Sequence, residues 1–489
     1  MLFNSHIFML LFLPLLLAGW YFLNWKKKFQ LAQGYLIGMS LWFYAYANLQ
    51  YLWLLLFSCL IGWLLSCLPE KIFSEKGKKV LTGVGCVFHL GLLGYFKYSN
   101  FFLENLNTVF HTDFPMLQIL LPVGISFYTF QQLAYLIDRC RGDAPRDSFF
   151  DYLTFMVYFP QLLQGPILLR SEFMGQLKEP ERRRFHAERF SEGIQFFVFG
   201  LAKKVLLADT LAKAVNYGYS NVSMLDSISA LLLAVGYLTE LYFDFSGYCD
   251  MAVGLGKMIG LEVAENFDAP FHSASVKEFW RRWHMTLGRF FTRYVYIPLG
   301  GNRRGKMRTL CNVMIVMLLS GLWHGAAWTF VLWGFLHGVG MIWDNLEHPH
   351  LPKKWMRQAA TFAYVCMTFV FFRAESIAQG VDVLKSIVSL KWNGFVFQMA
   401  SALDMTECYM ITKALSMKLP GLLSWFWLGI FVVLIAICVR VLFGEKVSGV
   451  VALQRQKGYG RLYPVLLAVL FTWSIISMTG VSEYLYFSF

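Results

Sequence analysis

The sequence predicts an all-α fold: a polytopic bundle of transmembrane helices in which short, re-entrant and interfacial helices surround a central tunnel. Its 489 residues are 57% hydrophobic and only 15% charged, whereas soluble domains carry roughly 25% charged residues. Apolar runs recur along the chain, for example over residues 7–23, 50–68 and 421–443. Each is close to the about 20 residues that a helix needs to cross a bilayer, where bundled helices satisfy the backbone.

The apolar runs follow one another without a polar linker, so we predict a single membrane domain over residues 1–489. The first run has no basic segment before it and no small-residue cleavage pattern after it, which favours a retained helix over a signal peptide. Three stretches, 121–137, 152–167 and 249–261, are short or interrupted by Gly and Pro. These need not all cross the membrane, because irregular backbone at membrane depth survives where protein or a water-filled cavity surrounds it.

Basic residues lie in the loops between the apolar runs. Lys26, Lys27 and Lys28 follow the first run, whereas the turn near Asn48 carries no charge. The positive-inside rule therefore predicts an outer N-terminus and, because the last span follows a basic loop, an outer tail at 482–489. We expect a multi-pass protein of the cytoplasmic (inner) membrane that contacts membrane lipids, and its formal charge of +13 does not indicate nucleic acid as a partner.

Acidic residues and cysteines do not suggest a metal site. The nine cysteines are scattered and form no CxxC pair, so we expect neither disulfides nor a metal. Asp244 and Asp250 lie six residues apart after an apolar run, which is too few ligands for a metal ion. We interpret both as buried carboxylates that pair with Arg281 or Arg282.

Two histidines are candidates for chemistry. His324 lies between two apolar runs beside Gly and Ala, and about 15 residues of helix place it roughly 22 Å from the preceding basic loop. A neutral histidine can take a proton from a hydroxyl, which suits acyl transfer, but a buried histidine bonded to a backbone carbonyl is an equal alternative. His284 ends an aromatic and basic segment typical of an interfacial helix, where it can instead face headgroups. We interpret His337 as a packing residue.

Two further segments have open interpretations. The Gly-rich loop 297–305, which includes Asn302 and Arg303, offers amides and cations that can receive phosphates such as those of coenzyme A, or it can be a turn against lipid headgroups. The aromatic tail 482–489 is typical of an interfacial belt. A tail tyrosine next to a histidine base can also act as a covalent nucleophile.

An ordered set of segments resembles the membrane-bound O-acyltransferase (MBOAT) family, in particular its bacterial branch that acylates cell-surface polymers. Alginate O-acetylation is the best-known role of that branch. The resemblance covers nearly the full chain and rests on residues 121–130, 159–161, 164–167, 244–248, 278–284, 296–303 and 321–326.

The resemblance implies roles for several residues. His324 matches the family's essential histidine, His284 matches the second histidine of its tunnel, and Tyr486 takes the place of a C-terminal tyrosine acyl acceptor. We expect no permanently bound cofactor, and acetyl-CoA as the co-substrate. The residues expected to bind it are Arg281, Arg282, Asn302 and Arg303.

The function expected from this set is transfer of an acetyl group from a cytoplasmic thioester to hydroxyls of an extracytoplasmic polysaccharide. A partner resembling an SGNH hydrolase would take the group from the tyrosine to the polymer. One alternative is D-alanyl transfer to teichoic acid, which the family also performs. Another is a transporter or flippase in which the histidines relay protons.

Overall fold

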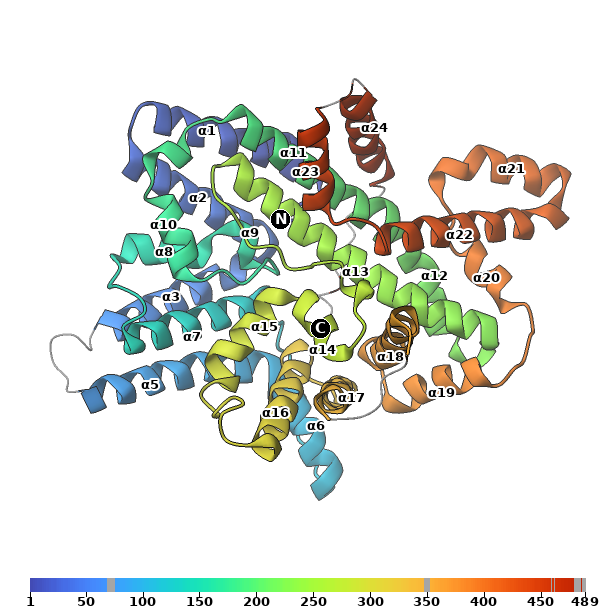
Figure 1. Ribbon diagram of the computed structural model, residues 1–489, viewed down its shortest axis with the longest axis horizontal. Coiled ribbons are helices and arrows are strands. Elements are labelled where there is room, and N and C mark those ends of the chain that lie inside the picture. The colour runs from blue at the N-terminus through green and yellow to red at the C-terminus, as the bar shows by residue number, and fades with distance from the viewer. Residues whose placement is uncertain (68–74, 347–351, 459, 461, 479–484, 486–489) are drawn as a thin grey trace. The chain divides into compact units, whose positions relative to one another are not determined.

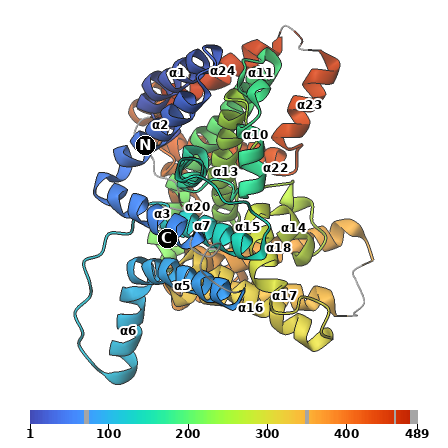
Figure 2. The same cartoon turned by 90° about the vertical axis from the view of Figure 1, so that its left-hand side faces the viewer.

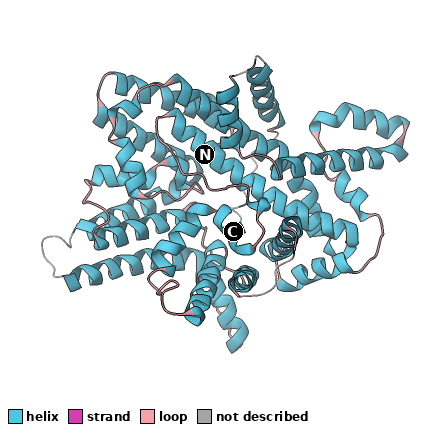
Figure 3. Ribbon diagram, in the orientation of Figure 1, coloured by secondary structure: helices cyan, strands magenta, loops and turns pink. Residues whose placement is uncertain are grey.

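The computed structural model describes residues 1–67, 75–346, 352–458, 460, 462–478 and 485. All regular structure in these ranges is helical, as Figure 3 shows, and this confirms the predicted all-α class. Within these ranges six helices are long and apolar enough to cross a membrane, which confirms a polytopic membrane protein. They are Phe8–Trp25, Leu49–Cys67, Lys76–Phe110, Ser227–Met258, Lys306–His324 and Pro420–Leu442. Three of them coincide with the apolar runs from which spans were predicted.

The described residues group into two compact units that interleave along the chain. Unit 1 comprises Met1–Phe197, Met251–Glu265 and Arg289–Tyr294, and unit 2 comprises Val198–Asp250, Asn266–Gly288 and Val295–Phe489. The single domain over residues 1–489 stays a prediction.

Unit 1 contains the N-terminal helices. Within it α1 packs on α2, and α5 packs on α7 (Figure 1). Figure 2 shows α6 leaving the end of α5 and the loop 111–124 returning towards α7. The helices are α1 (Leu13–Trp25), α2 (Phe29–Asn48), α3 (Leu52–Cys67), α5 (Glu75–Leu93), α6 (Ser99–Phe110), α7 (Ile125–Arg141), α8 (Phe149–Val157), α9 (Phe159–Leu162), α10 (Arg170–Leu177) and most of α11 (Ala187–Ala202).

Unit 2 contains a large aromatic core and the candidate histidines. α16 and α17 lie side by side, and α21 folds back along α22 (Figure 1). Its elements are η5 (Lys203–Ala208), α12 (Asp209–Ser220), the greater part of α13 (Ser227–Met258), α14 (Val276–Arg282), the start of α15 (Met285–Phe291), α16 (Lys306–His324), α17 (Trp328–Asn345), α18 (Lys354–Arg373), α19 (Ile377–Val388), α20 (Phe395–Ser401), α21 (Tyr409–Lys418), α22 (Pro420–Leu442), α23 (Val447–Lys457) and α24 (Leu462–Ser477).

The stretch 249–261 is helical through Gly254 and Gly256, because α13 continues to Met258, and the chain turns at Gly260, which has a positive φ of 87°. The glycines within α13 allow close helix contacts instead of breaking the helix. A Cβ on Gly247 would lie 2.7 Å from the carbonyl oxygen of Gly200, and one on Gly254 would lie 2.5 Å from that of Gly193. Small residues serve this purpose in membrane helices, which explains why only the last glycine of the stretch lies at a break.

Of the other two stretches, 121–137 is irregular only before α7, and 152–167 is broken along its length. Gly124 begins α7 with a left-handed φ of 79°, and a Cβ there would collide with the carbonyl oxygen of Leu162. The segment 152–167 forms α8, a break at Tyr158, the one-turn α9 and an extended loop. Two of the motifs that carry the family resemblance therefore pack directly against each other within unit 1.

Candidate active site

A strained turn places His284 inside unit 2. Ser275 caps α14 by accepting a hydrogen bond from the Glu278 amide, and the helix ends at Arg282. His284 then takes a left-handed φ of 47°, a conformation that is unusual for a residue with a Cβ. Its side chain is fully buried. The interpretation of His284 as a headgroup-facing residue is therefore wrong, because the chain turns inward after α14.

Asn266 fixes both the turn and the tautomer of His284. Its backbone carbonyl accepts a bond of 2.9 Å from the Met285 amide, and its side-chain Oδ1 accepts bonds of 3.1 Å and 3.0 Å from the amide and hydroxyl of Thr286. The same Oδ1 lies 3.2 Å from His284 Nδ1. Since a carbonyl oxygen can only accept, Nδ1 carries the proton and Nε2 is an acceptor in the neutral ring.

Burial keeps this ring neutral. His284 lies outside the six spanning helices, and burial lowers its pKa to about 3. Burial penalises the charged imidazolium, so the group is uncharged near pH 7. His284 is therefore suited to accept a hydrogen bond through Nε2 and not to act as a cation.

His324 is the last residue of α16 and is 3% exposed. The chain leaves the helix at Gly325, whose extended backbone packs so closely on the Phe330 ring that a Cβ would collide with it. The imidazole is surrounded by aromatic rings, with centroid distances of 4.9 Å to Trp323 and 5.2 Å to Trp333. His324 is thus held in an apolar, aromatic site at the end of the helix.

The two candidate histidines are neighbours in space although they are distant in sequence. Their ring centroids lie 6.2 Å apart with the planes at 57°. The ring of Trp323 lies close to both, 6.0 Å from that of His284. The fold thus brings both imidazoles together in one buried place, an arrangement that neither sequence segment reveals alone.

Close packing of α16 on α17 fixes the end of α16 that carries His324. A Cβ on Gly321 would collide with the carbonyl oxygen of Phe330, and one on Gly334 would lie 2.5 Å from that of Met317. Paired glycines let two membrane helices approach this closely. The position of His324 at the end of α16 thus depends on a glycine one turn before it.

Gly321→Ala is therefore expected to lower the thermal unfolding midpoint of the detergent-purified protein. A methyl group in this close contact forces a backbone shift that costs about 1–3 kcal/mol. Gly429→Ala is the matched control, because Gly429 lies inside α22 and a Cβ there meets no atom within 4 Å. It should be neutral or slightly stabilising, and equal effects of the two substitutions would contradict the packing argument.

His337 has a structural role. It is fully buried, and its Nδ1 accepts a bond of 3.2 Å from the Trp280 indole. Its Nε2 lies 2.9 Å from the Thr368 hydroxyl, which donates to the Val365 carbonyl at 2.8 Å. Both ring nitrogens thus form hydrogen bonds within the core. This agrees with the interpretation of His337 as a packing residue.

Two lysines, and not the predicted arginines, pair with the buried Asp244 and the half-buried Asp250 of α13. Lys204 Nζ lies 2.6 Å from Asp244 and 2.8 Å from Asp209, while Lys203 Nζ lies 2.7 Å from Asp250. The lysines begin η5, a π-helical turn. Gly247 allows this turn to approach α13, so short lysine-to-carboxylate distances are possible there.

The expected pairing of Asp244 and Asp250 with Arg281 or Arg282 is accordingly wrong. Arg282 pairs instead with Glu278, one turn earlier on α14, at 3.0 Å, and more distantly with Asp268 at 3.9 Å. Arg281 is exposed on the same helix. Arg282 is thus already paired with Glu278 and Asp268, which lie near it in the sequence.

The C-terminal tail reaches this region at its one described residue. The amide of Leu485 donates a bond of 3.2 Å to Asp244 Oδ2, and the Leu485 side chain packs against the core of unit 2. The next residue along α13 from Asp244 is Phe245, whose ring lies 4.8 Å from that of His284. Tyr486 lies outside the described residues.

The remaining predicted binding residues lie at the other end of α16 from His324. Asn302 and Arg303 are exposed in a loop whose Gly300, Gly301 and Gly305 all have positive φ. This loop is directly followed by the N-terminus of α16, which favours anions. Eighteen residue steps separate Lys306 from His324, so the helix spans roughly 27 Å between the loop and the histidine.

This fold and this site define a membrane protein in which aromatic residues of α13, α16, α17 and α18 surround a pair of buried histidines. Residues 141–375 match the MBOAT, membrane-bound O-acyltransferase family, and these residues include both histidines. The chain belongs to this family, as the sequence resemblance predicted.

Relatives of known name support the same assignment. The chain is 35% identical over 423 residues to peptidoglycan O-acetyltransferase of Helicobacter pylori, which covers 80% of each protein. It is 39% identical over 389 residues to the probable alginate O-acetylase AlgI of Azotobacter vinelandii, over 77% of this chain and 76% of the relative. Teichoic acid D-alanyltransferase of Bacillus subtilis is 28% identical over 52% of this chain. The chain is therefore a membrane-bound acyltransferase.

Proposed function

We propose that this protein is an O-acetyltransferase that moves acetyl groups across the cytoplasmic membrane to hydroxyls of an extracytoplasmic polysaccharide. The buried pair of His284 and His324 carries the proposal, because it gives one place for proton transfer. Relatives named for O-acetyl transfer to carbohydrate polymers are 35% and 39% identical, against 28% for a D-alanyltransferase. The polymer belongs to the cell surface and is of the alginate or peptidoglycan kind.

The donor is a cytoplasmic thioester, acetyl-CoA. Its phosphates would meet the cations and amides of the loop 297–305, and its acetyl group would reach His324 along the length of α16. Arg303 and Asn302 are exposed there and available to an anion, as is Arg281 on α14. Arg282 is less available because it already pairs with Glu278.

The acyl acceptor within the protein is Tyr486. Its phenolic oxygen attacks the thioester carbonyl while His324 takes the phenolic proton, the C–S bond breaks, and the thiolate of coenzyme A leaves and is protonated by His324. The product is a tyrosyl acetate ester. His284, with its acceptor nitrogen, orients these groups, whereas the alternative role of polarising the thioester carbonyl would need a donor that its tautomer lacks.

Anchoring of the tail supports this relay. Leu485 directly precedes Tyr486 in the chain. Its amide donates a hydrogen bond to the buried carboxylate of Asp244. A hydrogen bond to an ionised acceptor is worth more than a neutral one, typically 1.5–3 kcal/mol. A partner resembling an SGNH hydrolase then carries the acetyl group to the polymer at the outer face, with both termini on that face.

The test measures ester groups on the surface polysaccharide of a deletion strain complemented with wild type, Tyr486→Phe or Tyr484→Phe. Tyr486→Phe removes one oxygen and is expected to abolish acetylation at normal membrane abundance. Tyr484→Phe, the control in the same tail, should restore acetate. Full acetylation by Tyr486→Phe would contradict the relay.

Mass spectrometry of the extracted polymer separates the proposal from its alternatives. Acetate esters support it, and D-alanyl esters would point to the teichoic acid reaction instead. Transport of a substrate without any ester, unaffected by the tail substitution, would indicate a transporter or flippase.

A further inference from the structure

One cavity of unit 2 lies apart from the histidines. It has a volume of about 910 Å³ and lies between η5 with the start of α12 on one side and α22, α23 and α24 on the other. Neither histidine and no residue of α14, α16 or α17 lines it. Apolar side chains make up most of its wall, among them Phe199, Leu206, Ile430, Val433, Ile437 and Leu470.

The cavity is long and follows a membrane span. Its wall on α22 extends from Ile430 to Val441, and eleven residue steps along a helix span roughly 16 Å. α22 belongs to the helices that are apolar enough to cross a bilayer. An apolar channel of this length parallel to a span fits an extended hydrocarbon chain better than a compact polar metabolite, which needs several convergent polar groups.

One end of the cavity carries two opposite charges. Arg440 and Glu445 both line it at the end of α22, and neither forms an ion pair with another described residue. The other basic residue of the wall, Lys203, already pairs with Asp250 at 2.7 Å. Glu407 accepts a bond from the Ser477 hydroxyl. A guanidinium favours phosphate and a carboxylate favours an ammonium group, so the pair matches a zwitterionic headgroup.

We propose that this cavity binds a zwitterionic phospholipid such as phosphatidylethanolamine. One acyl chain lies along α22, the phosphate contacts Arg440, and the ammonium group contacts Glu445. The lipid is a structural ligand of unit 2, and its binding does not depend on acyl transfer.

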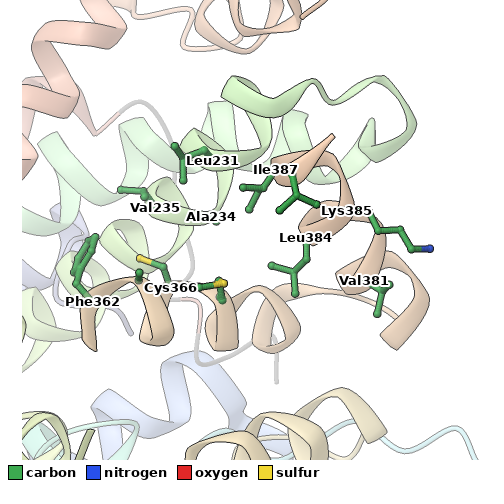
Figure 4. A pocket seen from close by; sticks show the side chains of 12 residues that line it. Leu231, Ala234, Val235, Phe362, Cys366, Val381, Leu384, Lys385 and Ile387 are labelled. Atoms are coloured by element: carbon green, nitrogen blue, oxygen red, sulfur yellow. The ribbon is translucent and has the colours of Figure 1, made fainter. Parts of the chain in front are cut away.

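Another cavity of unit 2 lacks such a charge pair. It has a volume of about 490 Å³ and lies between α13, α18 and α19. Lys385 is the sole charged residue of its wall. Figure 4 shows the Lys385 ammonium pointing away from the apolar side chains, and it lies 3.2 Å from Asp382. This cavity therefore has no means of selecting a headgroup.

Neighbouring valines of α22 provide a matched test. Val433 lines the cavity and is 57% exposed, whereas Val432 is 59% exposed and does not line it. Both can carry a tryptophan without overfilling the core. Val433→Trp should displace the lipid from the cavity, and Val432→Trp should not.

The experiment is native mass spectrometry of the full chain in detergent, titrated with dioleoyl phosphatidylethanolamine or dioleoyl phosphatidylglycerol. We expect one tightly bound phosphatidylethanolamine in wild type and in Val432→Trp, and its loss in Val433→Trp. Arg440→Gln, on an exposed side chain, should weaken binding by about tenfold or more, since a bond to a charged group is worth 1.5–3 kcal/mol.

Three results would overturn the proposal. Equal retention by the two tryptophan variants would mean that the lipid lies elsewhere on the surface. Equal or tighter binding of phosphatidylglycerol would mean that the Arg440 and Glu445 pair does not select a zwitterion. Wild-type affinity in Arg440→Gln would remove the phosphate contact.

Discussion

Replacing His324 by alanine or glutamine is expected to lower acetyl transfer by about 10²- to 10⁴-fold, the usual contribution of a general base. Glutamine keeps hydrogen-bonding atoms of similar reach but has no basic nitrogen, so it separates lost basicity from lost packing. The measurement is polymer-bound acetate in the complemented deletion strain, divided by the amount of protein in the membrane. Both variants should remain in the membrane at near wild-type amounts.

His337→Gln is the control for this prediction. His337 is buried like His324, but both its nitrogens bond to neighbouring side chains. Its loss should therefore lower protein abundance or thermal stability more than acetate per molecule. If His324→Gln restored full acetylation, the assignment of His324 as the base would be wrong and a transport role would gain support.

Asp244→Asn is expected to release the tail and to reduce acetylation by about 10- to 100-fold, because it removes the charge from the acceptor of the Leu485 amide. Lys204 keeps Asp209 as a partner at 2.8 Å, so the substitution does not leave a buried lysine unpaired. The measurement is maleimide labelling of a tail cysteine, Ser488→Cys, in intact cells, with acetate measured in parallel. Labelling should rise as acetate falls.

Asp250→Asn is the matched control for Asp244→Asn. Both residues lie on α13 and pair with adjacent lysines of η5 at 2.6–2.7 Å, but no bond from Leu485 reaches Asp250. Asp250→Asn should therefore leave tail labelling unchanged. Equal labelling in the two variants would show that ion pairing on α13, and not the bond to Leu485, controls the tail.

Much of the fold can be predicted because hydropathy alone marks a span. The runs at 7–23, 50–68 and 421–443 became spanning helices, as their length and lack of charge require in a bilayer. The stretch 249–261 could not be predicted in the same way. From the sequence, its glycines indicate an interruption. That Gly254 instead allows a close contact between helices is visible only in the structure, where Gly193 lies against it.

The residues of the candidate site could be predicted where their neighbours in the sequence mark them as unusual. The sequence surroundings of His324 and His284 mark them as unusual, and the fold brings them together. Asn266 gives no such signal, because a single amide between short irregular segments looks like any loop residue. Lys204 was missed for a similar reason: its partner Asp244 lies on another helix, and ion pairs of that kind leave no spacing pattern.

The interleaving of the two units constrains how the chain is made. The last stretch of unit 1, Arg289–Tyr294, is synthesised after more than half of the chain has left the ribosome. α13 begins in unit 2 and ends in unit 1, so neither unit can mature before the other has started. Domains usually fold in order from the N-terminus during synthesis. Here unit 2 begins at Val198, before unit 1 is complete at Tyr294, so the units cannot be completed one after the other in that order.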